Sequence, residues 1–171
     1  MTLKDYLYKD AELSQRLLIP ENKPGLKKIA AFFAHSGDSW FWGVGLALLW
    51  IFGPLIWRPR IQLLFIGILV TAISVLILKF SIKRPRPEGE WGQIYRSSDP
   101  HSFPSGHAAR ATMLTMLILL AGPFWLGLVM IGWALLVAIS RIGLGVHFVS
   151  DILAGTILGI LFGGVVFLIF G

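Results

Sequence analysis

The sequence contains no cysteine, which excludes disulfides and thiolate metal sites. Charged residues are also scarce, at 14% of the chain, whereas soluble domains carry about 25%. No cleavable signal peptide is expected, because the first apolar run begins only near Trp40, after a polar and charged leader. Apolar residues are abundant instead: they make up 56% of the 171 positions, with a mean hydropathy of +0.75. We therefore expect a membrane protein.

The charge that remains is mostly positive, with a formal net charge of +6. Basic residues can orient a membrane protein, attract anionic headgroups or bind an anionic substrate. Here they are interleaved with apolar segments and form no separate basic stripe. Nucleic acid is therefore not an expected partner.

Five apolar segments are candidates to span a bilayer, which takes about 20 apolar residues, or somewhat fewer with interfacial anchors. They predict an all-α fold, a polytopic membrane helical bundle of about five transmembrane helices. The last segment is rich in glycine, which suits close packing of helices in lipid. The five segments are Trp40–Trp57, Ile61–Lys79, Ser105–Leu120, Phe124–Ser140 and Asp151–Phe170.

Two amphipathic pieces, Leu3–Ile19 and Gly25–His35, precede these segments. Neither is apolar enough to span, and both are expected either to lie in the membrane interface or to remain solvated. We therefore divide the chain into an amphipathic interfacial leader, residues 1–38, and a transmembrane domain, residues 39–171, which carries the candidate catalytic residues.

The unusual polar residues of this domain all fall on one membrane face if each segment crosses once. That face receives the end of the second segment, the start of the third, the end of the fourth and the start of the fifth. Three polar clusters meet there: KFSIKRPRP at 79–87, PSGH at 104–107 and SRIGLGVHFVSD at 140–151.

These clusters combine arginines, lysines and a helix start. Arginine presents a planar fork that matches phosphate oxygens, and lysine adds a compact charge. A helix that begins at Ser105-Gly106-His107 directs backbone N–H groups toward an anion. Gly106 also lets a ligand come close to the backbone. The face is therefore expected to bind phosphate.

Two histidines add reactivity to this face. His147 and Asp151 are four residues apart and are expected to share a helix face. The carboxylate can hold one ring nitrogen and leave the other free as base, nucleophile or ligand. His107, on a different segment, can act as a general acid. Two histidines with separate roles suit phosphoryl transfer through a phosphohistidine.

The three clusters resemble the K-x6-R-P, P-S-G-H and S-R-x5-H-x3-D elements of the type 2 phosphatidic acid phosphatase (PAP2) superfamily. Each element is complete, and they occur in the family's order. The resemblance covers the chain from Lys79 to its end, and the five-segment pattern resembles the family's helical core. The usual membrane members carry six spans, and here the leader stands in place of the first.

This resemblance implies a metal-independent lipid phosphatase in the cell membrane. Its substrate would be a phosphomonoester or diphosphate on a membrane lipid, such as phosphatidate, phosphatidylglycerol phosphate or a polyprenyl phosphate. His147 would be the nucleophile, Asp151 its orienting partner and His107 the acid for the leaving group. The resemblance implies no metal and no cofactor, and no obligate protein partner is evident. The residues that resemble the family's phosphate cradle are Lys79, Arg86, Ser105, Gly106 and Arg141.

Three other functions use similar residues. Two histidines and a carboxylate also form metal triads, but Lys79, Arg86 and Arg141 would repel a cation. A small membrane transporter or channel subunit is a second alternative, although the centres of the spans are apolar and no repeat is visible. A lipid phosphotransferase that uses the same site is the third.

Several positions have two interpretations. Lys83 and Arg84 are favoured as interfacial anchors, and Arg110 either contacts a headgroup or extends to the interface. The loop EGEWGQIYRSSDPH, residues 88–101, is expected to distinguish substrates. The excess of basic residues on the polar face favours a cytoplasmic active site, whereas bacterial members of the family often act on the outer face.

Overall fold

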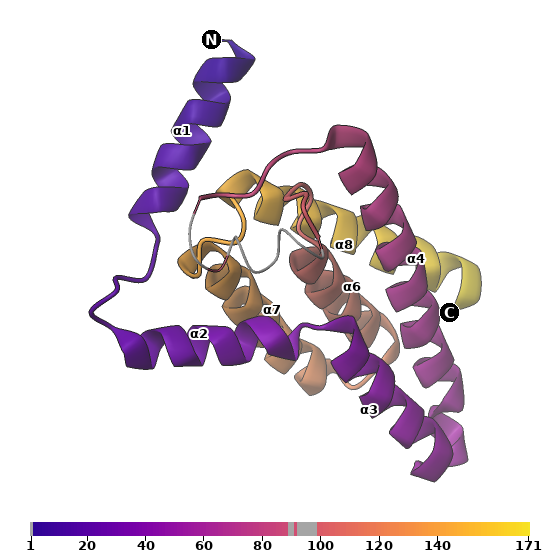
Figure 1. Ribbon diagram of the computed structural model, residues 1–171. Coiled ribbons are helices and arrows are strands. Elements are labelled where there is room, and N and C mark those ends of the chain that lie inside the picture. Colours follow the sequence, from indigo (N-terminus) through magenta and orange to yellow (C-terminus); the bar gives the residue numbers. More distant parts are fainter. Residues whose placement is uncertain (1, 89–90, 92–98) are drawn as a thin grey trace.

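The computed structural model describes residues 2–88, 91 and 99–171. Most of the loop expected to distinguish substrates therefore lies outside the described residues. Within them the regular secondary structure is helical (Figure 1), which confirms the predicted all-α fold. The helices are α1 (Leu3–Arg16), α2 (Pro24–Ser36), α3 (Ser39–Phe52), the 3-10 helix η1 (Leu55–Trp57), α4 (Arg58–Ile82), α6 (Gly106–Ala121), α7 (Phe124–Gly143) and α8 (Val149–Phe170).

Three segments are long and apolar enough to cross a membrane: Leu55–Ile82, Phe124–Gly143 and Val149–Phe170. At 1.5 Å per residue, even the shortest of these reaches about 30 Å, the thickness of the hydrocarbon core. The other two predicted spans are present as shorter apolar helices, α3 with 14 residues and α6 with 16. The chain is a multi-pass membrane protein, as predicted.

The first predicted span, Trp40–Trp57, is not one continuous helix. Helix α3 ends at Phe52, because Pro54 lacks an N–H and its ring disfavours a helical conformation at Gly53. The segment Arg58–Arg60, expected to be a loop, instead forms the first turn of α4. Proline is compatible with a first helical turn, where its missing N–H has no partner to lose.

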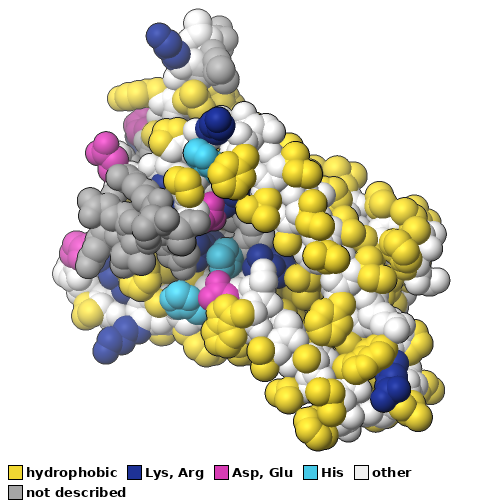
Figure 2. All heavy atoms as spheres, turned by 45° about the vertical axis from the view of Figure 1, so that its right-hand side comes forward, with side chains coloured by type: hydrophobic (Ala, Val, Ile, Leu, Met, Phe, Trp, Pro, Cys, Tyr) yellow, Lys and Arg dark blue, Asp and Glu magenta, His cyan; other side chains and the backbone are white. Residues whose placement is uncertain are grey.

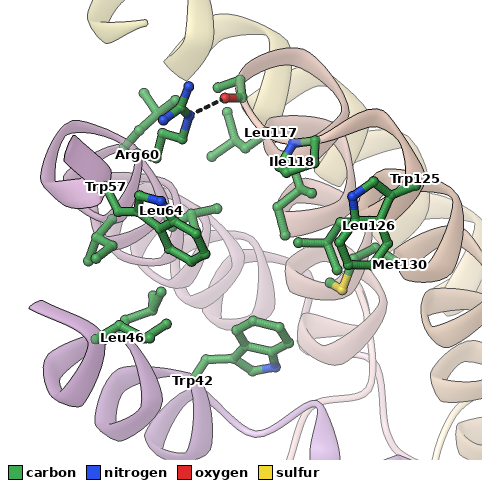
Figure 3. A pocket seen from close by; sticks show the side chains of 16 residues that line it. Trp42, Leu46, Trp57, Arg60, Leu64, Leu117, Ile118, Trp125, Leu126 and Met130 are labelled. Carbon is green, nitrogen blue, oxygen red and sulfur yellow. Dashed lines mark hydrogen bonds between the residues drawn. The ribbon is translucent and has the colours of Figure 1, made fainter. Parts of the chain in front are cut away.

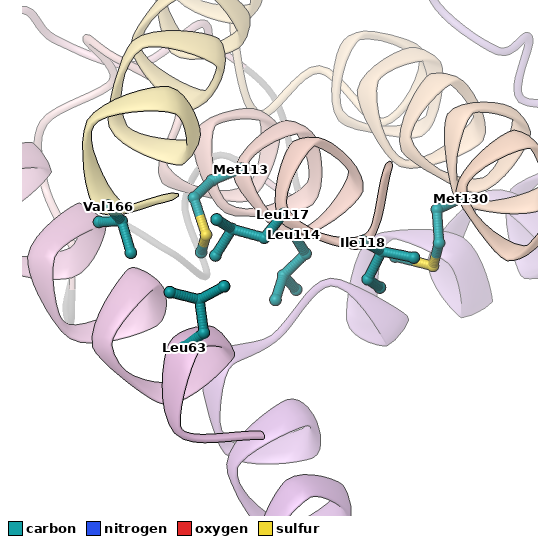
Figure 4. Close-up of a cluster of buried hydrophobic side chains, with 7 residues drawn as sticks. All are labelled: Leu63, Met113, Leu114, Leu117, Ile118, Met130 and Val166. Carbon is teal, nitrogen blue, oxygen red and sulfur yellow. The ribbon is translucent and has the colours of Figure 1, made fainter. Parts of the chain in front are cut away.

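Helix α6 lies at the centre of the bundle and packs against α4, α7 and α8 (Figure 1). Figure 4 shows the apolar core that these four helices share. The buried side chains of this core are Leu63, Met113, Leu114, Leu117, Ile118, Met130 and Val166.

Glycines let α8 approach α6 closely. A Cβ atom on Gly155 would lie 2.5 Å from the carbonyl oxygen of Ser105, and one on Gly159 would lie 2.4 Å from that of Ala109. Both distances are too short for a side chain, so only glycine fits. The close contact brings the first turn of α6 beside the first turn of α8.

The polar residues of the domain gather at one end of the bundle. The C-terminal end of α4, the start of α6, the end of α7 and the start of α8 meet there, because successive spans run in opposite directions. Figure 2 shows hydrophobic side chains over most of one face, with acidic, basic and histidine side chains gathered toward one end. The predicted one-sided placement of the three clusters is therefore confirmed.

The two leader helices form close to their predicted bounds. Helix α1 begins with a capping box, in which Thr2 and Asp5 satisfy each other's backbone N–H groups. Helix α1 contacts α8, and α2 lies along α7. The leader thus packs against the polar end of the bundle.

Candidate active site

The three sequence clusters line two small cavities at the polar end. One, of about 220 Å³, is lined by Lys79, Asp99, Gly106, His107 and Arg110 together with apolar residues of α4. The other, of about 210 Å³, is lined by residues that include Arg86 and His147 and faces α1. Five of the eight predicted catalytic and phosphate-binding residues line these cavities, namely Lys79, Arg86, Gly106, His107 and His147, whereas Ser105, Arg141 and Asp151 are buried and line neither.

His147 and Asp151 form a buried pair. His147 lies in the turn between α7 and α8, and Asp151 is the third residue of α8. The Nδ1 atom of His147 is 3.4 Å from Oδ2 of Asp151, which also accepts from the backbone N–H of Phe148 at 2.9 Å. A hydrogen on Nδ1 fits the carboxylate, so Nε2 carries the lone pair.

The free nitrogen of His147 faces Arg86. Its Nε2 atom lies 3.3 Å from Nη1 of Arg86, which also donates to the carbonyl of Val146 at 2.8 Å. Burial lowers the pKa of His147 well below its usual range, and the charges of Arg141, Arg86 and Lys79 lower it further. The ring is therefore neutral at neutral pH, which is the protonation state a nucleophile requires.

Lys79 and Arg86 converge on Asp99. Lys79 lies in the last turn of α4 and its Nζ donates to Oδ2 of Asp99. Arg86 donates to the same oxygen from Nη2 at 2.7 Å and to the Asp99 carbonyl from Nε at 2.7 Å. Both cations are buried, whereas the Asp99 side chain is 40% exposed. The cluster is thus a cation cradle that already binds an oxyanion.

Ser105, Gly106 and Arg141 complete the predicted set. Ser105 caps α6 by accepting from the N–H of Ala108 at 3.4 Å, and its own N–H donates to the carbonyl of Asp151 at 3.0 Å. Its buried hydroxyl therefore fixes the start of α6. Gly106 lines the cavity, and Arg141 is buried near the end of α7, where its charge acts on both His107 and His147.

His107 has a carboxylate partner of its own. Its Nε2 atom lies 2.7 Å from Oδ1 of Asp38, the residue between α2 and α3. The sequence offers no signal for this contact, because Asp38 lies 69 positions away in the leader.

Arg84 is paired between two carboxylates with its side chain only 12% exposed, so its favoured interpretation as an interfacial anchor is wrong. Its Nη1 donates to Asp151 and its Nη2 to Asp10, both at 2.7 Å, and its guanidinium lies over the ring of Phe148. Asp10 lies on α1, and nothing in the sequence distinguishes it from any other acidic residue of an amphipathic helix.

Arg110 belongs to the site and does not extend to the interface. It lines the cavity beside His107, and its Nη1 donates to the carbonyl of Gly37 at the end of α2. The start of α6 is thereby attached to the leader.

The charge of the site suits an anion. Among the described residues, no group of three His, Asp or Glu side chains is arranged to hold a metal ion. Lys79, Arg86 and Arg141 instead surround His147 with positive charge. Such a set stabilises charge on phosphoryl oxygens.

Comparison with known proteins gives the following matches. Residues 59–171 match the PAP2 superfamily. An undecaprenyl-diphosphatase of Sulfolobus acidocaldarius is 29% identical over 142 residues, which are 78% of this chain and 66% of that protein. A decaprenylphosphoryl-5-phosphoribose phosphatase of Mycobacterium tuberculosis is 32% identical over 149 residues, 85% of this chain and 81% of that protein.

A solved structure has the same fold. It is a transmembrane PAP2 type phosphatidylglycerolphosphate phosphatase from Bacillus subtilis, with a TM-score of 0.79 at 26% identity. The match covers 96% of this chain and 86% of that chain. The leader helices are therefore included in the similarity.

Proposed function

Because the chain belongs to the PAP2 superfamily, we propose that it removes a terminal phosphate from a membrane lipid through a phosphohistidine at His147. The relatives confirm the predicted class, a lipid phosphatase, over a transporter or channel subunit. The substrate and the roles of individual residues are our proposal. The observation that carries it is the buried His147–Asp151 pair, whose second ring nitrogen faces Arg86.

The first step transfers the phosphoryl group to the enzyme. Nε2 of neutral His147 attacks phosphorus, and the bond to the leaving oxygen breaks with its electron pair on that oxygen. His107 passes a proton to this oxygen. Asp151 accepts a hydrogen bond from Nδ1–H, which stays on the ring, and stabilises the positive charge that develops there.

The second step hydrolyses the phosphohistidine. His107, now neutral, takes a proton from a water molecule as that water attacks phosphorus. The phosphorus–nitrogen bond breaks, its electron pair returns to Nε2, and inorganic phosphate leaves. The enzyme regains its starting protonation state.

The cation cradle stabilises both steps. Lys79, Arg86 and Arg141 supply fixed positive charge where the phosphoryl oxygens gain negative charge. Gly106 lines the cavity that Lys79 also lines, and it leaves room for a phosphoryl oxygen near the first N–H groups of α6. These groups are already buried and oriented, so little reorganisation is needed in the transition state.

A polyprenyl phosphate or diphosphate is the substrate we favour. Two of the relatives are named for polyprenyl-linked substrates. The fold also offers room for a long chain: an apolar cavity of about 570 Å³ lies between α3, α4, α6 and α7 (Figure 3). Leu64 and Leu117 in this cavity lie seven residues from Thr71 and Arg110 in the polar one, about 10 Å along α4 and α6.

We place the leader, residues 1–38, in the membrane interface. Exposed apolar side chains on α1, among them Tyr6, Leu7 and Leu13, support this location. The boundary at residue 38 separates an interfacial segment from a transmembrane segment. Both segments contribute to the site, because Asp10 and Asp38 contact site residues of the transmembrane domain. The purified chain is expected to work without a second protein.

Phosphate release by the purified chain tests the proposal. Undecaprenyl diphosphate, phosphatidylglycerol phosphate and phosphatidate are compared in detergent micelles, and we expect the polyprenyl substrate to have the highest kcat/KM. Rapid quenching with a phosphoryl-labelled substrate should trap an acid-labile, base-stable phosphoenzyme. His147→Ala should form none and lose turnover, His107→Ala should nearly lose turnover, and Asp151→Asn should slow it.

His101→Ala is the control, because that ring packs against Phe80 outside the cavities. It should turn over at the wild-type rate. Wild-type turnover by His147→Ala would overturn the nucleophile, and a preference for phosphatidate would overturn the polyprenyl assignment. Transfer of the label to an added alcohol in place of water would instead identify a phosphotransferase.

A further inference from the structure

Asp38 bridges two histidines at the junction of α2 and α3. Its Oδ1 lies 2.7 Å from Nε2 of His107, and its Oδ2 lies 3.2 Å from Nδ1 of His35. The two rings differ in environment: the side chain of His107 is 15% exposed and that of His35 is 54% exposed. Asp38 therefore connects the buried cavity histidine to the protein surface.

The backbone around Asp38 is held by contacts that a solvated surface acid would not have. The indole N–H of Trp42 donates to the carbonyl of Ser36 at 3.0 Å, and that of Trp133 donates to the Ser36 hydroxyl at 2.9 Å. Arg110 binds the carbonyl of Gly37. The two residues before Asp38 are thus fixed to α6 through Arg110 and to α7 through Trp133, and Trp42 of α3 binds the same segment.

The junction also packs tightly against the ring of His107. A Cβ atom on Gly37 would lie 3.2 Å from both Cδ2 of His107 and Cγ1 of Val137. The backbone of Gly37 therefore lies close to the ring, with little room for a side chain between them. The orientation of His107 is therefore set by the leader and not only by α6.

Asp38 provides the negative charge in a basic surrounding. Arg141 and Arg110 both act on His107 with positive charge, and Asp38 is the acidic group that opposes them. Burial raises the pKa of Asp38, but the hydrogen bonds and charges of His107 and His35 outweigh burial and lower it to about 2. Asp38 is therefore a carboxylate at neutral pH.

We propose that Asp38 is the positioning residue of His107, which it holds with Nε2–H toward the carboxylate and Nδ1 toward the leaving oxygen. This inference rests on the proposed function, because it assigns the proton path of that reaction. The carboxylate stabilises the imidazolium before transfer. The Nδ1–H bond then breaks as the O–H bond of the leaving group forms, and Nδ1 later recovers a proton from the attacking water. Nδ1 is assigned because Nε2 is occupied and the ring lines the cavity.

The dependence on the leaving group tests this role. Asp38→Asn is assayed on a prenyl monophosphate, whose alkoxide must be protonated, and on p-nitrophenyl phosphate, whose phenolate leaves without a proton. General acids contribute about 100- to 10,000-fold. We expect kcat on the prenyl substrate to fall about 10- to 100-fold, and kcat on the nitrophenyl substrate to stay within about threefold.

Two further variants separate positioning from folding. Asp38→Glu keeps the charge and should recover part of the lost rate on the prenyl substrate. Asp38→Asn combined with His107→Ala should be no slower than His107→Ala alone, since both changes remove the same proton transfer. Asp5→Asn is the matched control, because among the described residues this leader carboxylate bonds within the first turn of α1, and it should match the wild type on both substrates.

The outcomes are distinguishable. An equal loss on both substrates, or additive effects in the double variant, would show that Asp38 acts only on folding or binding and would overturn the inference. An unchanged rate on the prenyl substrate would do the same. If the wild-type protein releases phosphate from neither substrate, the proposed function fails. If the wild type is active and Asp38→Asn leaves the ratio of the rates on the two substrates unchanged, only the inference fails.

Discussion

The carboxylate of Asp99 holds the two cations that a phosphoryl group needs. Its Oδ2 accepts from Nζ of Lys79 and, at 2.7 Å, from Nη2 of Arg86. Carboxylate and phosphate oxygens bind such donors with the same geometry. Because the Asp99 side chain is 40% exposed, it can leave the cradle when the substrate enters. We therefore expect Asp99 to compete with phosphate for the site.

Asp99→Asn should strengthen binding of anions. The amide cannot offer a charged oxygen to Lys79 and Arg86, so phosphate no longer displaces an ion pair. We expect the inhibition constant of inorganic phosphate to fall about three- to tenfold, the equivalent of roughly 1 kcal/mol for a partly exposed pair. Product-inhibition kinetics measure this directly. Weaker inhibition would mean that Asp99 orients the cradle instead of competing for it.

Excess chelator should leave the activity intact. Lys79, Arg86 and Arg141 place buried positive charge around His147, which disfavours a divalent cation and favours an oxyanion. The assay compares phosphate release before and after dialysis against EDTA. Loss of activity that returns with added metal would contradict a mechanism carried by histidine and fixed cations alone.

Residues within the three clusters could be predicted, whereas their acidic partners could not. His147 and Asp151 lie four positions apart, a spacing that places them on one face and is visible in the sequence. Asp10, Asp38 and Asp99 reach the site only through the tertiary fold. A lone aspartate in a leader or loop carries no periodic or spacing signal that separates it from a solvated acid.

Helix α1 caps helix α8 from outside. The hydroxyl of Ser14 accepts from the N–H of Val149 at 3.0 Å, and Oδ1 of Asp10 accepts from the N–H of Ser150 at 3.0 Å. These are two of the backbone donors that a helix start leaves without an internal partner. Through Arg84 the same aspartate also supports Asp151. The leader element thus fixes the helix that carries the partner of the proposed nucleophile.

Asp10→Asn should therefore slow catalysis more than it weakens substrate binding. The amide can still accept from Ser150, but it no longer pairs with Arg84, so Asp151 is held less firmly. We expect kcat to fall about tenfold with KM within about twofold, since small misplacements of catalytic groups cost large factors. Glu12→Gln is the control on the same helix, because Glu12 pairs with Arg16 at the surface. Equal kinetics for both variants would contradict the coupling of α1 to Asp151.

Gly159→Ala should destabilise the bundle. The new Cβ would lie 2.4 Å from the carbonyl oxygen of Ala109, so α6 and α8 must separate. Overpacking of this kind costs about 1–3 kcal/mol. Thermal unfolding in detergent should show a lower midpoint for this variant. The midpoint of Gly164→Ala should stay at the wild-type value, because a Cβ there has nothing within 4 Å. An unchanged midpoint for Gly159→Ala would mean that the α6–α8 contact is looser than described.

The order and type of the helices could be predicted from the sequence, but not every boundary. Apolar length and the Gly122-Pro123 break delimit α6 and α7. Gly53-Pro54 breaks the first predicted span in the same way, but the flanking Trp40 and Trp57 suggested one continuous segment. The packing of α1 and α2 against the domain could not be predicted, because an amphipathic helix shows which face is apolar and not what covers it.

The whole molecule is polar at one end and apolar along its length. Leu55–Ile82 runs from the opposite end to the site, with Lys79 in its last turn. The leader joins the polar end through Asp10 and Asp38. In the proposed reaction a lipid substrate would keep its chain in the bilayer while its phosphate reaches the polar end, where the leader packs.

Cysteine labelling tests this arrangement, since the chain has no cysteine of its own. Lys28→Cys on α2 and Lys83→Cys after α4 are both exposed and should react with an impermeant maleimide from the same side. Ile56→Cys, 74% exposed at the other end of the Leu55–Ile82 segment, should react only from the opposite side, because that segment is long enough to cross the bilayer. Labelling of all three from one side would contradict a spanning α4. Labelling of Lys83→Cys in intact cells would place the active site outside, and labelling only after permeabilisation would place it in the cytoplasm, as the positive-inside rule favours.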